Sequence, residues 1–427
     1  MFDIDRRSST IFSRVTSATT ITIMKSGPRR REAWLPRLIA HLNSRRTRAL
    51  IPEFGSLPAA EKIDRAVRVF RRLADEEPDA DLRPSRRWSL EYMEACARGA
   101  GARRQFLIDE GVFEGGELLV APARVQPQME IGNLDPASYS GSFSQEVAAL
   151  RALMFQEYFG VKSLLAIPEA ADLVACIAPT LVGRLPPPRL KLSLLLRDYV
   201  ERIVSETRRG DLPLVAVFGE GKGEELVPLV VRGLSVICFD AHDQQFTRDL
   251  LLGTFRQSAV DPPEMVALSE LGEVHTSVSA WKRLGCSPTI FILSDTDVTR
   301  DELFPEQLHG IASVAASVYL LHELRRKEAF FANLASISKG SIVVFDGNPS
   351  TAGLDNIVLP VSDRHEAVVT GHDAVVSHLL SQTPAQMEAI ARRAVPELHW
   401  ESSLVGPPLP PPLFYKLQGA VIGRRSR

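Results

Sequence analysis

The sequence predicts a mainly α-helical N-terminal region followed by an α/β domain with a Rossmann-like, doubly wound, mostly parallel seven-stranded sheet. Three observations predict this fold class. After residue 210, apolar runs of strand length alternate with helical segments. The runs are nearly continuous, as strands that are buried on both faces must be. A glycine-rich stretch follows the first run directly, in LVAVFGEGKG, which is typical of a strand that turns at once into a helix.

Five apolar runs are expected to form buried parallel strands, in chain order LVAVFG, LSVICFD, TIFILSD, SVAASVYLL and SIVVFDG. Helical segments such as Gln244–Arg256 and Lys327–Ile337 lie between them. A last strand, Phe414–Ile422, follows a proline-rich linker and precedes no helix, which favours an antiparallel strand at the edge of the sheet. The long interval Gln257–Pro288 is interpreted as an insertion that bears part of a substrate pocket.

The residues before the sheet have helical periodicity. The sequence predicts helices over Gln145–Gly160 and Leu190–Arg208. Another is expected around an apolar stripe whose members recur at intervals of three and four residues: Ile63, Ala66, Val67, Phe70 and Leu73. The segment Phe106–Val125 breaks this rhythm at Gly115-Gly116, which indicates a helix that leads into a small β-wing.

We therefore expect three segments. Residues 1–30 are rich in Ser, Thr and Arg and are predicted to form a disordered leader. Residues 31–209 are predicted to form a helical lid or dimerisation domain, and residues 210–427 the α/β domain. An organellar transit peptide and translation from Met24 are alternative interpretations of the leader.

Composition and charge exclude several kinds of protein. The 427 residues are 45% hydrophobic and 24% charged with a formal net charge of -2, so no strong field favours nucleic acid or a membrane surface. No apolar run reaches the roughly 18 residues of a membrane span. The four cysteines lie far apart and form no CxxC pair, which indicates reduced thiols of a cytoplasmic protein: Cys96, Cys176, Cys238 and Cys286.

The glycines at 219, 221 and 223 follow the first strand directly. A strand that turns at once into a helix passes its backbone close to whatever lies at its carboxyl end, and glycine permits that approach. Asp240, 21 positions after Gly219, closes the second strand, where a carboxylate can accept hydrogen bonds from two ribose hydroxyls. The pattern predicts a cofactor that contains adenosine. A tight turn with no ligand is the alternative interpretation of the glycines.

The residues after the loop distinguish between adenosine cofactors. The dinucleotide fingerprint requires glycine at position 224, where this chain has Glu224. Glu224 and Glu225 would oppose a pyrophosphate, whereas S-adenosylmethionine carries a cationic sulfonium and no phosphate. The sequence therefore favours S-adenosylmethionine over NAD or FAD.

With these motifs, Leu212–Arg427 resembles the class I S-adenosylmethionine-dependent methyltransferases. GEGKG is similar to their first motif, and Asp240 matches the acid that binds the ribose. LSDTD (Leu293–Asp297) is similar to the third-strand motif whose acid contacts the adenine amino group, which implies that role for Asp295. SVYLLHELRRKEAFFANLASISKGSIVVFDG resembles their fourth strand, following helix and fifth strand.

The resemblance implies S-adenosylmethionine as the cofactor and a set of residues that bind it: Gly219, Glu220, Gly221, Gly223, Asp240, Ala241, Asp295 and Thr296. The chain departs from the family at Val217, because the family commonly has an acid two residues before the first glycine. Glu220 is expected to replace that acid in part. Capping of a helix N-terminus by SDTD is the alternative role for Asp295.

His322 and Glu323 follow the fourth strand, so they are expected beyond the carboxyl ends of the strands, where a methyl acceptor would lie. Methyl transfer to a hydroxyl or an acidic carbon needs a base, and a neutral imidazole can take the proton. We predict that both residues are catalytic, with capping of the next helix as the alternative. No histidine spacing suggests a metal site, so no metal is expected.

An N-terminal helical domain before such a fold is similar to the arrangement in small-molecule methyltransferases of specialised metabolism. The sequence thus predicts methyl transfer to a small organic acceptor, in a possible homodimer without membrane or nucleic-acid partners. The basic clusters Arg29–Arg31 and Arg45–Arg48 lack interleaved aromatic residues, which indicates solvated surface. An NAD(P)-dependent oxidoreductase is one alternative. A non-catalytic methyltransferase-like binding protein, which the departure at Val217 favours, is the other.

Overall fold

In the computed structural model of the protein, the described residues are 58–112, 122, 124–127, 129–134, 136–164, 194–210, 212–219, 223–240, 244–258, 260–294, 296–349, 354, 359, 368–405 and 418–425. The predicted leader and the Gly115-Gly116 part of the predicted β-wing lie outside these residues. No helix in the described ranges is long and apolar enough to cross a membrane.

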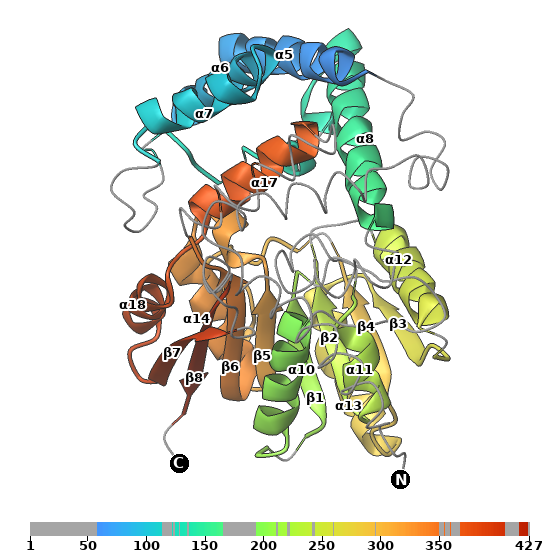
Figure 1. Ribbon diagram of the computed structural model, residues 1–427. Helices are drawn as coiled ribbons and strands as arrows, with labels where there is room; N and C mark the ends of the chain where they lie inside the picture. The colour runs from blue at the N-terminus through green and yellow to red at the C-terminus, as the bar shows by residue number, and fades with distance from the viewer. Residues whose placement is uncertain are drawn as a thin grey trace, which may run out of the picture.

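Eight strands form one mixed sheet (Figure 1). Their bounds are β1 Leu214–Phe218, β2 Ser235–Phe239, β3 Glu264–Leu268, β4 Thr289–Leu293, β5 Ala312–Val318, β6 Ser338–Gly347, β7 His399–Val405 and β8 Gln418–Arg424. They lie in the order β3-β4-β2-β1-β5-β6-β8-β7. Strand β8 is antiparallel to both of its neighbours, β6 and β7, and all other neighbouring strands pair in parallel. The predicted Rossmann-like, mostly parallel sheet is confirmed, with eight strands instead of seven.

Two strands were missed by the sequence patterns, and for one physical reason. Segment Gln257–Pro288 contains β3 and helix α13 (Leu271–Arg283), which add a parallel strand outside β4. The last strand, β8, is antiparallel as predicted, but β7 covers its outer side, so the expectation that it forms the edge is wrong. Both missed strands lie at sheet edges and carry several exposed residues. They therefore lack the continuous apolar run that marks a buried strand.

Helices cover both faces of the sheet. Because successive strand residues point to opposite sides, alternate side chains enter two separate cores. Phe218, Phe239 and Phe291 pack on one face with α13, α14 (Lys327–Ile337) and α18 (Pro384–Ala394). The intervening residues pack on the other face with α10 (Leu194–Thr207), α11 (Leu226–Val231) and α12 (Gln244–Gln257).

A third hydrophobic core lies in a helical cap at one end of the sheet (Figure 1). The cap consists of α5 (Ala59–Glu76), α6 (Arg83–Ala97), α7 (Ala100–Asp109), α8 (Gly141–Leu164) and α17 (Val368–Leu380), with the short 3₁₀ helices η2 (Ile131–Asn133) and η3 (Pro136–Ser138). The predicted apolar stripe lies on α5, where Ala66, Phe70 and Leu73 are buried in this core.

The packing does not divide at residue 210. Helix α10 precedes that residue and packs on the sheet, whereas α17 follows it and packs in the cap. Each layer thus contains helices from both sides of the expected boundary. The division into residues 31–209 and 210–427 stays a prediction.

Glu206 fastens α10 to the sheet. Its side chain is 1% exposed, accepts a hydrogen bond from Arg424 Nη2 on β8 at 2.9 Å, and accepts another from Ser341 Oγ on β6 at 2.9 Å. Burial raises the pKa of the Glu206 carboxyl, but the hydrogen bonds from Arg424 and Ser341 and the charge of Arg424 lower it further, so the pKa lies below its usual value.

We expect Glu206→Gln to lower the free energy of unfolding by about 2 kcal/mol near neutral pH, because charge-assisted hydrogen bonds in a buried position are lost. A depressed folded-state pKa stabilises the protein above the unfolded pKa, near 4.5 for Glu, and this contribution is lost as pH falls through the folded pKa. In denaturant unfolding, the difference in free energy of unfolding between the variant and the wild type should therefore be smaller at about pH 4 than at about pH 7.

The matched control is Glu201→Gln on the same helix, because Glu201 is 62% exposed and its ion pair with Arg232 is solvated. This control should change stability little at either pH. A Glu206→Gln destabilisation of the same size at both pH values would contradict the assigned ionisation.

Candidate functional site

The candidate site lies where the order of the parallel strands reverses. Apart from β3, the parallel strands of this part of the sheet lie in the order β4-β2-β1-β5-β6. Counted along the chain without β3, this is the doubly wound order third, second, first, fourth, fifth. In such sheets a ligand binds beyond the carboxyl ends of the strands at the reversal, which falls here between β1 and β5. The antiparallel strand β8 and its neighbour β7 complete the sheet beyond β6. This strand order fits the class I methyltransferase fold that the sequence resemblance implies.

Gly219 leaves β1 at this reversal with a φ of 66°, and Gly223 ends the loop with a φ of 63°. A Cβ at Gly219 would lie 2.8 Å from Leu320 Cδ2, and one at Gly223 would lie 2.1 Å from Leu251 Cδ2 on α12. Both positions therefore require glycine for backbone conformation and for space. Of the predicted loop residues, Glu220 and Gly221 lie outside the described part of the chain.

Asp240 lies at the carboxyl end of β2 and is buried. Its backbone N–H donates to the carbonyl of Leu293 on β4, and its carbonyl accepts from the N–H of Thr296, so the ends of β2 and β4 are tied together. Ser294, which lies between Leu293 and Thr296 in the sequence, has a buried hydroxyl without a hydrogen-bond partner among the described residues. A carboxylate and an unsatisfied hydroxyl at neighbouring strand ends fit the polar edge of an adenosine. Ala241 and Asp295 lie outside the described residues.

Two buried carboxyl groups follow the glycine loop directly. Glu224 and Glu225 are 6% and 3% exposed and precede α11. Negative charge this close to the loop opposes the binding of a pyrophosphate, which would carry two further negative charges. The charge of Glu225 also acts on Tyr199 of α10, and the preference for S-adenosylmethionine over a dinucleotide stays a prediction from the sequence.

His322 lies in η5 (Leu321–Glu323), the short 3₁₀ helix beyond β5, and is 4% exposed. Its Nδ1 lies 2.6 Å from Asp346 Oδ1 at the end of β6, and its Nε2 lies 2.7 Å from Ser377 Oγ on α17. Burial lowers the pKa of His322, but the charge and hydrogen bond of Asp346 raise it further, so the pKa lies above its usual value. The ring joins the sheet to the cap.

A hydroxyl, an imidazole and a carboxylate in this order also activate the serine nucleophile of acyl-transfer enzymes. A nucleophile must reach its substrate, yet neither Ser377 nor His322 lines the pocket that adjoins this site. Ser377 and Asp346 contact both ring nitrogens and thereby hold the orientation of the imidazole ring.

Two carboxylates face the same imidazole nitrogen. Glu130 Oε1 lies 4.0 Å from His322 Nε2, and Glu323 Oε1 lies 3.7 Å from it. Burial and the negative charges of Glu323, Asp373 and Asp346 raise the pKa of Glu130 well above its usual value. Sequence reasoning found His322 and Glu323 but not Glu130.

The position of Glu130 is fixed from α17. The carboxylate of Asp373 accepts hydrogen bonds from the backbone N–H groups of Ile131 at 2.8 Å and Gly132 at 3.1 Å. His372 Nδ1 lies 3.1 Å from the same carboxylate, and its Nε2 lies 3.0 Å from Ser89 Oγ on α6. The cap is therefore built so that Glu130 is held over the end of β5.

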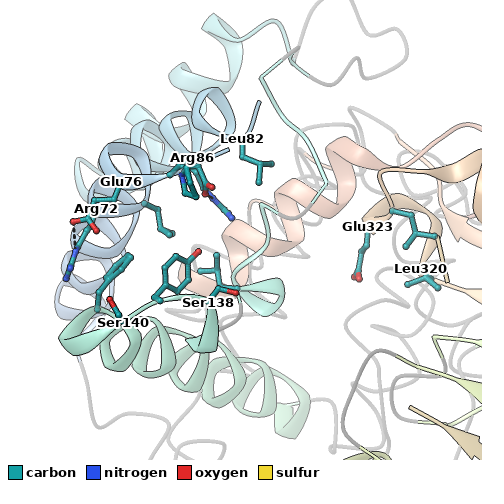
Figure 2. A pocket seen from close by; sticks show the side chains of 15 residues that line it. Arg72, Glu76, Leu82, Arg86, Ser138, Ser140, Leu320 and Glu323 are labelled. Carbon is teal, nitrogen blue, oxygen red and sulfur yellow. Dashed lines mark hydrogen bonds and ion pairs between the residues drawn. The ribbon is translucent and has the colours of Figure 1, made fainter. Parts of the chain in front are cut away.

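A pocket of about 670 Å³ lies between the cap and the carboxyl edge of the sheet (Figure 2). Leu320, Glu323 and Leu324 line it from the side of the sheet. Figure 2 shows Arg72, Glu76 and Arg86 opposite, on the cap, where Leu73, Leu82, Leu134, Tyr139 and Phe143 supply apolar surface. No described residue of Gln257–Pro288 lines this pocket. The segment adds β3 to the sheet, and its part in a substrate pocket stays a prediction.

Two cation contacts organise the cap side of this pocket. Arg86 Nε lies 3.1 Å from Glu77 Oε2, and both side chains are buried. The Arg72 guanidinium lies 4.2 Å from the centroid of the Phe143 ring. Both arginines are thereby fixed at the wall by an ion pair and a cation–π contact.

No protein-family model and no curated protein matches the chain. Among solved structures, the trans-methyltransferase CalH in complex with SAH is 13% identical, covers 86% of this chain and 90% of its own, and has a TM-score of 0.37. Magnesium protoporphyrin IX methyltransferase ChlM from Synechocystis PCC 6803 is 16% identical, covers 54% of this chain and 82% of its own, and has a TM-score of 0.31. The plantazolicin methyltransferase BpumL is 10% identical over 65% and 99%, with a TM-score of 0.35. Likenesses this low say nothing about the acceptor.

We expect Gly219→Ala to weaken the binding of S-adenosylhomocysteine about tenfold or more, because the new Cβ meets Leu320 in addition to the strain of a positive φ. Gly233→Ala is the matched control, since Gly233 also has a positive φ, of 82°, but a Cβ there meets nothing within 4 Å. Both variants should lose about 1 kcal/mol of stability from backbone strain. Calorimetric affinities that fall equally in both variants would contradict a local role for Gly219.

Proposed function

We propose that the protein transfers the methyl group of S-adenosylmethionine to a small organic acceptor that binds in the pocket between the cap and the sheet. One contact carries this proposal: Leu320 lies against Gly219 and also lines the pocket. A cofactor that follows the glycine loop would therefore adjoin an acceptor in the pocket. This adjacency is what direct transfer between two bound molecules requires.

In the proposed complex, the Asp240 carboxylate accepts hydrogen bonds from the ribose hydroxyls. The other proposed contacts come from the residues that the family resemblance implies: Gly219, Glu220, Gly221, Gly223, Ala241, Asp295 and Thr296. When bound, S-adenosylmethionine supplies an electrophilic methyl group on its sulfonium. The buried pair Glu224 and Glu225 supports this cofactor over NAD(P). S-adenosylmethionine carries no phosphate, whereas the pyrophosphate of NAD(P) would add negative charge near these two carboxyl groups.

The chemistry of the pocket supports a small acceptor. Its volume lies within the range of about 300–1,000 Å³ that is usual for small-molecule sites, and its wall combines leucines and aromatic rings with a few fixed charges. The charges on the wall include both signs, as Arg72, Arg86, Glu76, Glu77 and Glu323 show. Such a wall gives no continuous positive groove for a nucleic-acid backbone. An acceptor from specialised metabolism, a homodimer and a cytoplasmic location remain parts of this proposal.

Glu323 and His322 would divide the catalytic work between them. Glu323 lines the pocket and its side chain is 32% exposed, so it is the one of the two that can contact an acceptor. His322 lies behind it with both ring nitrogens engaged by Asp346 and Ser377. We therefore assign proton abstraction from the acceptor to Glu323, and to His322 the positioning of that carboxylate.

Binding tests the cofactor assignment. We expect Asp240→Asn to weaken S-adenosylhomocysteine binding by roughly 10- to 100-fold, because hydrogen bonds to a charged group contribute about 1.5–3 kcal/mol each. Asp297→Asn is the control, since this exposed carboxylate caps Thr299 at 2.9 Å and lies two residues after Asp295. Calorimetry measures the affinity of both variants for S-adenosylhomocysteine and for NAD.

An unchanged affinity in Asp240→Asn would remove the ribose role. Binding of NAD without any response to S-adenosylhomocysteine would establish the oxidoreductase alternative. Tight S-adenosylhomocysteine binding with no transfer to any member of an acceptor panel would favour the non-catalytic alternative.

Turnover tests the division of roles at the pocket. Once an acceptor is found by release of S-adenosylhomocysteine, Glu323→Gln should lower kcat about 100-fold with unchanged cofactor affinity. His322→Gln should lower kcat less and should also shift the pH profile, because a positioning group is lost. Glu328→Gln on the exposed side of α14 is the control. Normal turnover in Glu323→Gln would leave positioning of the two substrates as the source of rate.

A further inference from the structure

Three side chains converge below the pocket from segments that are distant in sequence. Glu130, His322 and Glu323 each offer one ligand atom, and these three atoms all lie within 4.8 Å of one another. His322 comes from the end of β5, and Glu130 precedes η2 in the cap. One imidazole and two carboxylates form a mixed nitrogen and oxygen donor set of the kind that holds divalent transition-metal ions.

The imidazole is prepared for such a role. Asp346 Oδ1 lies 2.6 Å from Nδ1, and it also accepts the backbone N–H of Gly347 at 2.9 Å, so it is a fixed acceptor. A carboxylate that accepts from Nδ1–H leaves the lone pair of a neutral ring on Nε2, which is the atom that faces Glu130 and Glu323. Histidine ligands of metals commonly have this second contact, because it fixes the tautomer and raises the basicity of the ligating nitrogen.

The described residues do not balance the negative charge around Glu130. Glu130 is 9% exposed, and its Oε1 points at this cluster without a hydrogen-bond partner in the described ranges. The charges that act on it are all negative, from Glu323, Asp373 and Asp346. A buried carboxylate oxygen without a hydrogen-bond donor or a nearby cation is costly.

Lys327 is a cation that acts on part of this cluster. Its charge acts on His322 and Asp346, while its Nζ donates to the carbonyl of Leu324 at 2.5 Å. It is absent from the charges that act on Glu130. Among the described residues, no cation is thus found to act on Glu130.

We propose that Glu130, His322 and Glu323 bind one divalent transition-metal ion of the Mn²⁺ or Zn²⁺ class. Bonds of about 2.1 Å place neighbouring ligand atoms about 3.0–3.5 Å apart. The distances of 4.0 Å and 3.7 Å from Nε2 to Glu130 and Glu323 must therefore shorten by up to about 1 Å on binding. Because Glu323 also lines the pocket, the ion adjoins the acceptor, a consequence that rests on the proposed function. Glu323 would bind the ion through Oε1, the atom near Nε2, and would keep its other carboxylate oxygen for the proton of the acceptor.

Ser377 provides an internal contrast. Its Oγ lies 2.7 Å from Nε2, so its hydroxyl occupies the lone pair that the ion would take. If the cluster exists to orient His322 through Ser377, then removing the hydroxyl disturbs it. If the cluster binds a metal, removing the hydroxyl takes away a competitor. Ser377→Ala therefore separates an ion site from a purely structural hydrogen-bond chain.

The full-length protein, treated with a chelator and then freed of it, is titrated with Mn²⁺ and separately with Zn²⁺ and Mg²⁺. Calorimetry and the electron paramagnetic resonance signal of free Mn²⁺ give affinity and stoichiometry. We expect one bound ion per chain, with Mg²⁺ weaker because of the imidazole ligand. Glu130→Gln and His322→Gln should each weaken Mn²⁺ binding about tenfold or more, whereas Ser377→Ala should retain or tighten it. Glu76→Gln, in the pocket wall but outside the cluster, should leave binding unchanged.

The proposal is overturned if no ion binds stoichiometrically, if Glu130→Gln binds as tightly as the wild type, or if Ser377→Ala abolishes binding. Folding is checked in the presence of chelator, where Glu130→Gln should have a melting temperature equal to or above that of the wild type, because it relieves repulsion among carboxylates. No cofactor or acceptor enters the titration, so its failure is distinguishable from failure of the proposed methyl transfer.

Discussion

The reversal of strand order between β1 and β5 is the constraint on which the rest of the structure depends. Because these two strands are parallel neighbours whose connections leave in opposite directions, their carboxyl ends open a crevice. The glycine loop leaves one side of it and η5 leaves the other. Tyr319 adopts a φ of 58°, which is unusual for a residue with a side chain, and the next residue, Leu320, then lies against Gly219. The cofactor loop and the pocket wall thereby share one contact.

Helix α17 links the cap to the end of the sheet at this crevice. Helix α17 comes from the chain between β6 and β7, yet its core residues pack with α5, α6 and α8. Its Ser377 contacts His322, and its Asp373 holds the backbone beside Glu130. One helix thus links the end of the sheet to the cap and positions both sides of the charged cluster. The pocket and the cluster depend on the same connection, which explains why they lie next to each other.

Much of this arrangement follows from local patterns in the sequence. The five buried strands are continuous apolar runs, α14 has the bounds predicted from its periodicity, and Gly219 and Asp240 end their strands as expected. Strands β3 and β7 were not predicted, because they lie at the edges of the sheet and exposed residues interrupt their apolar patterns.

The rest of the site depends on contacts between distant segments. Glu130 lies 192 positions before His322, in a stretch with no motif, and only the packing of the cap on the sheet brings the two together. Asp346 stands in a recognisable strand end, VVFDG, but its role follows from the imidazole beside it. Ser377 is one small, partly buried residue of α17. No spacing rule within one element predicts a cluster of this kind.

A crystal structure of the protein with S-adenosylhomocysteine tests the central claim most directly, because it locates every contact at once. The account predicts the adenosine at the carboxyl ends of β1, β2 and β4, with the ribose hydroxyls on the Asp240 carboxylate and the sulfur directed toward the pocket beyond Leu320. A ligand bound elsewhere, or a ribose at this edge that makes no contact with Asp240, would contradict it.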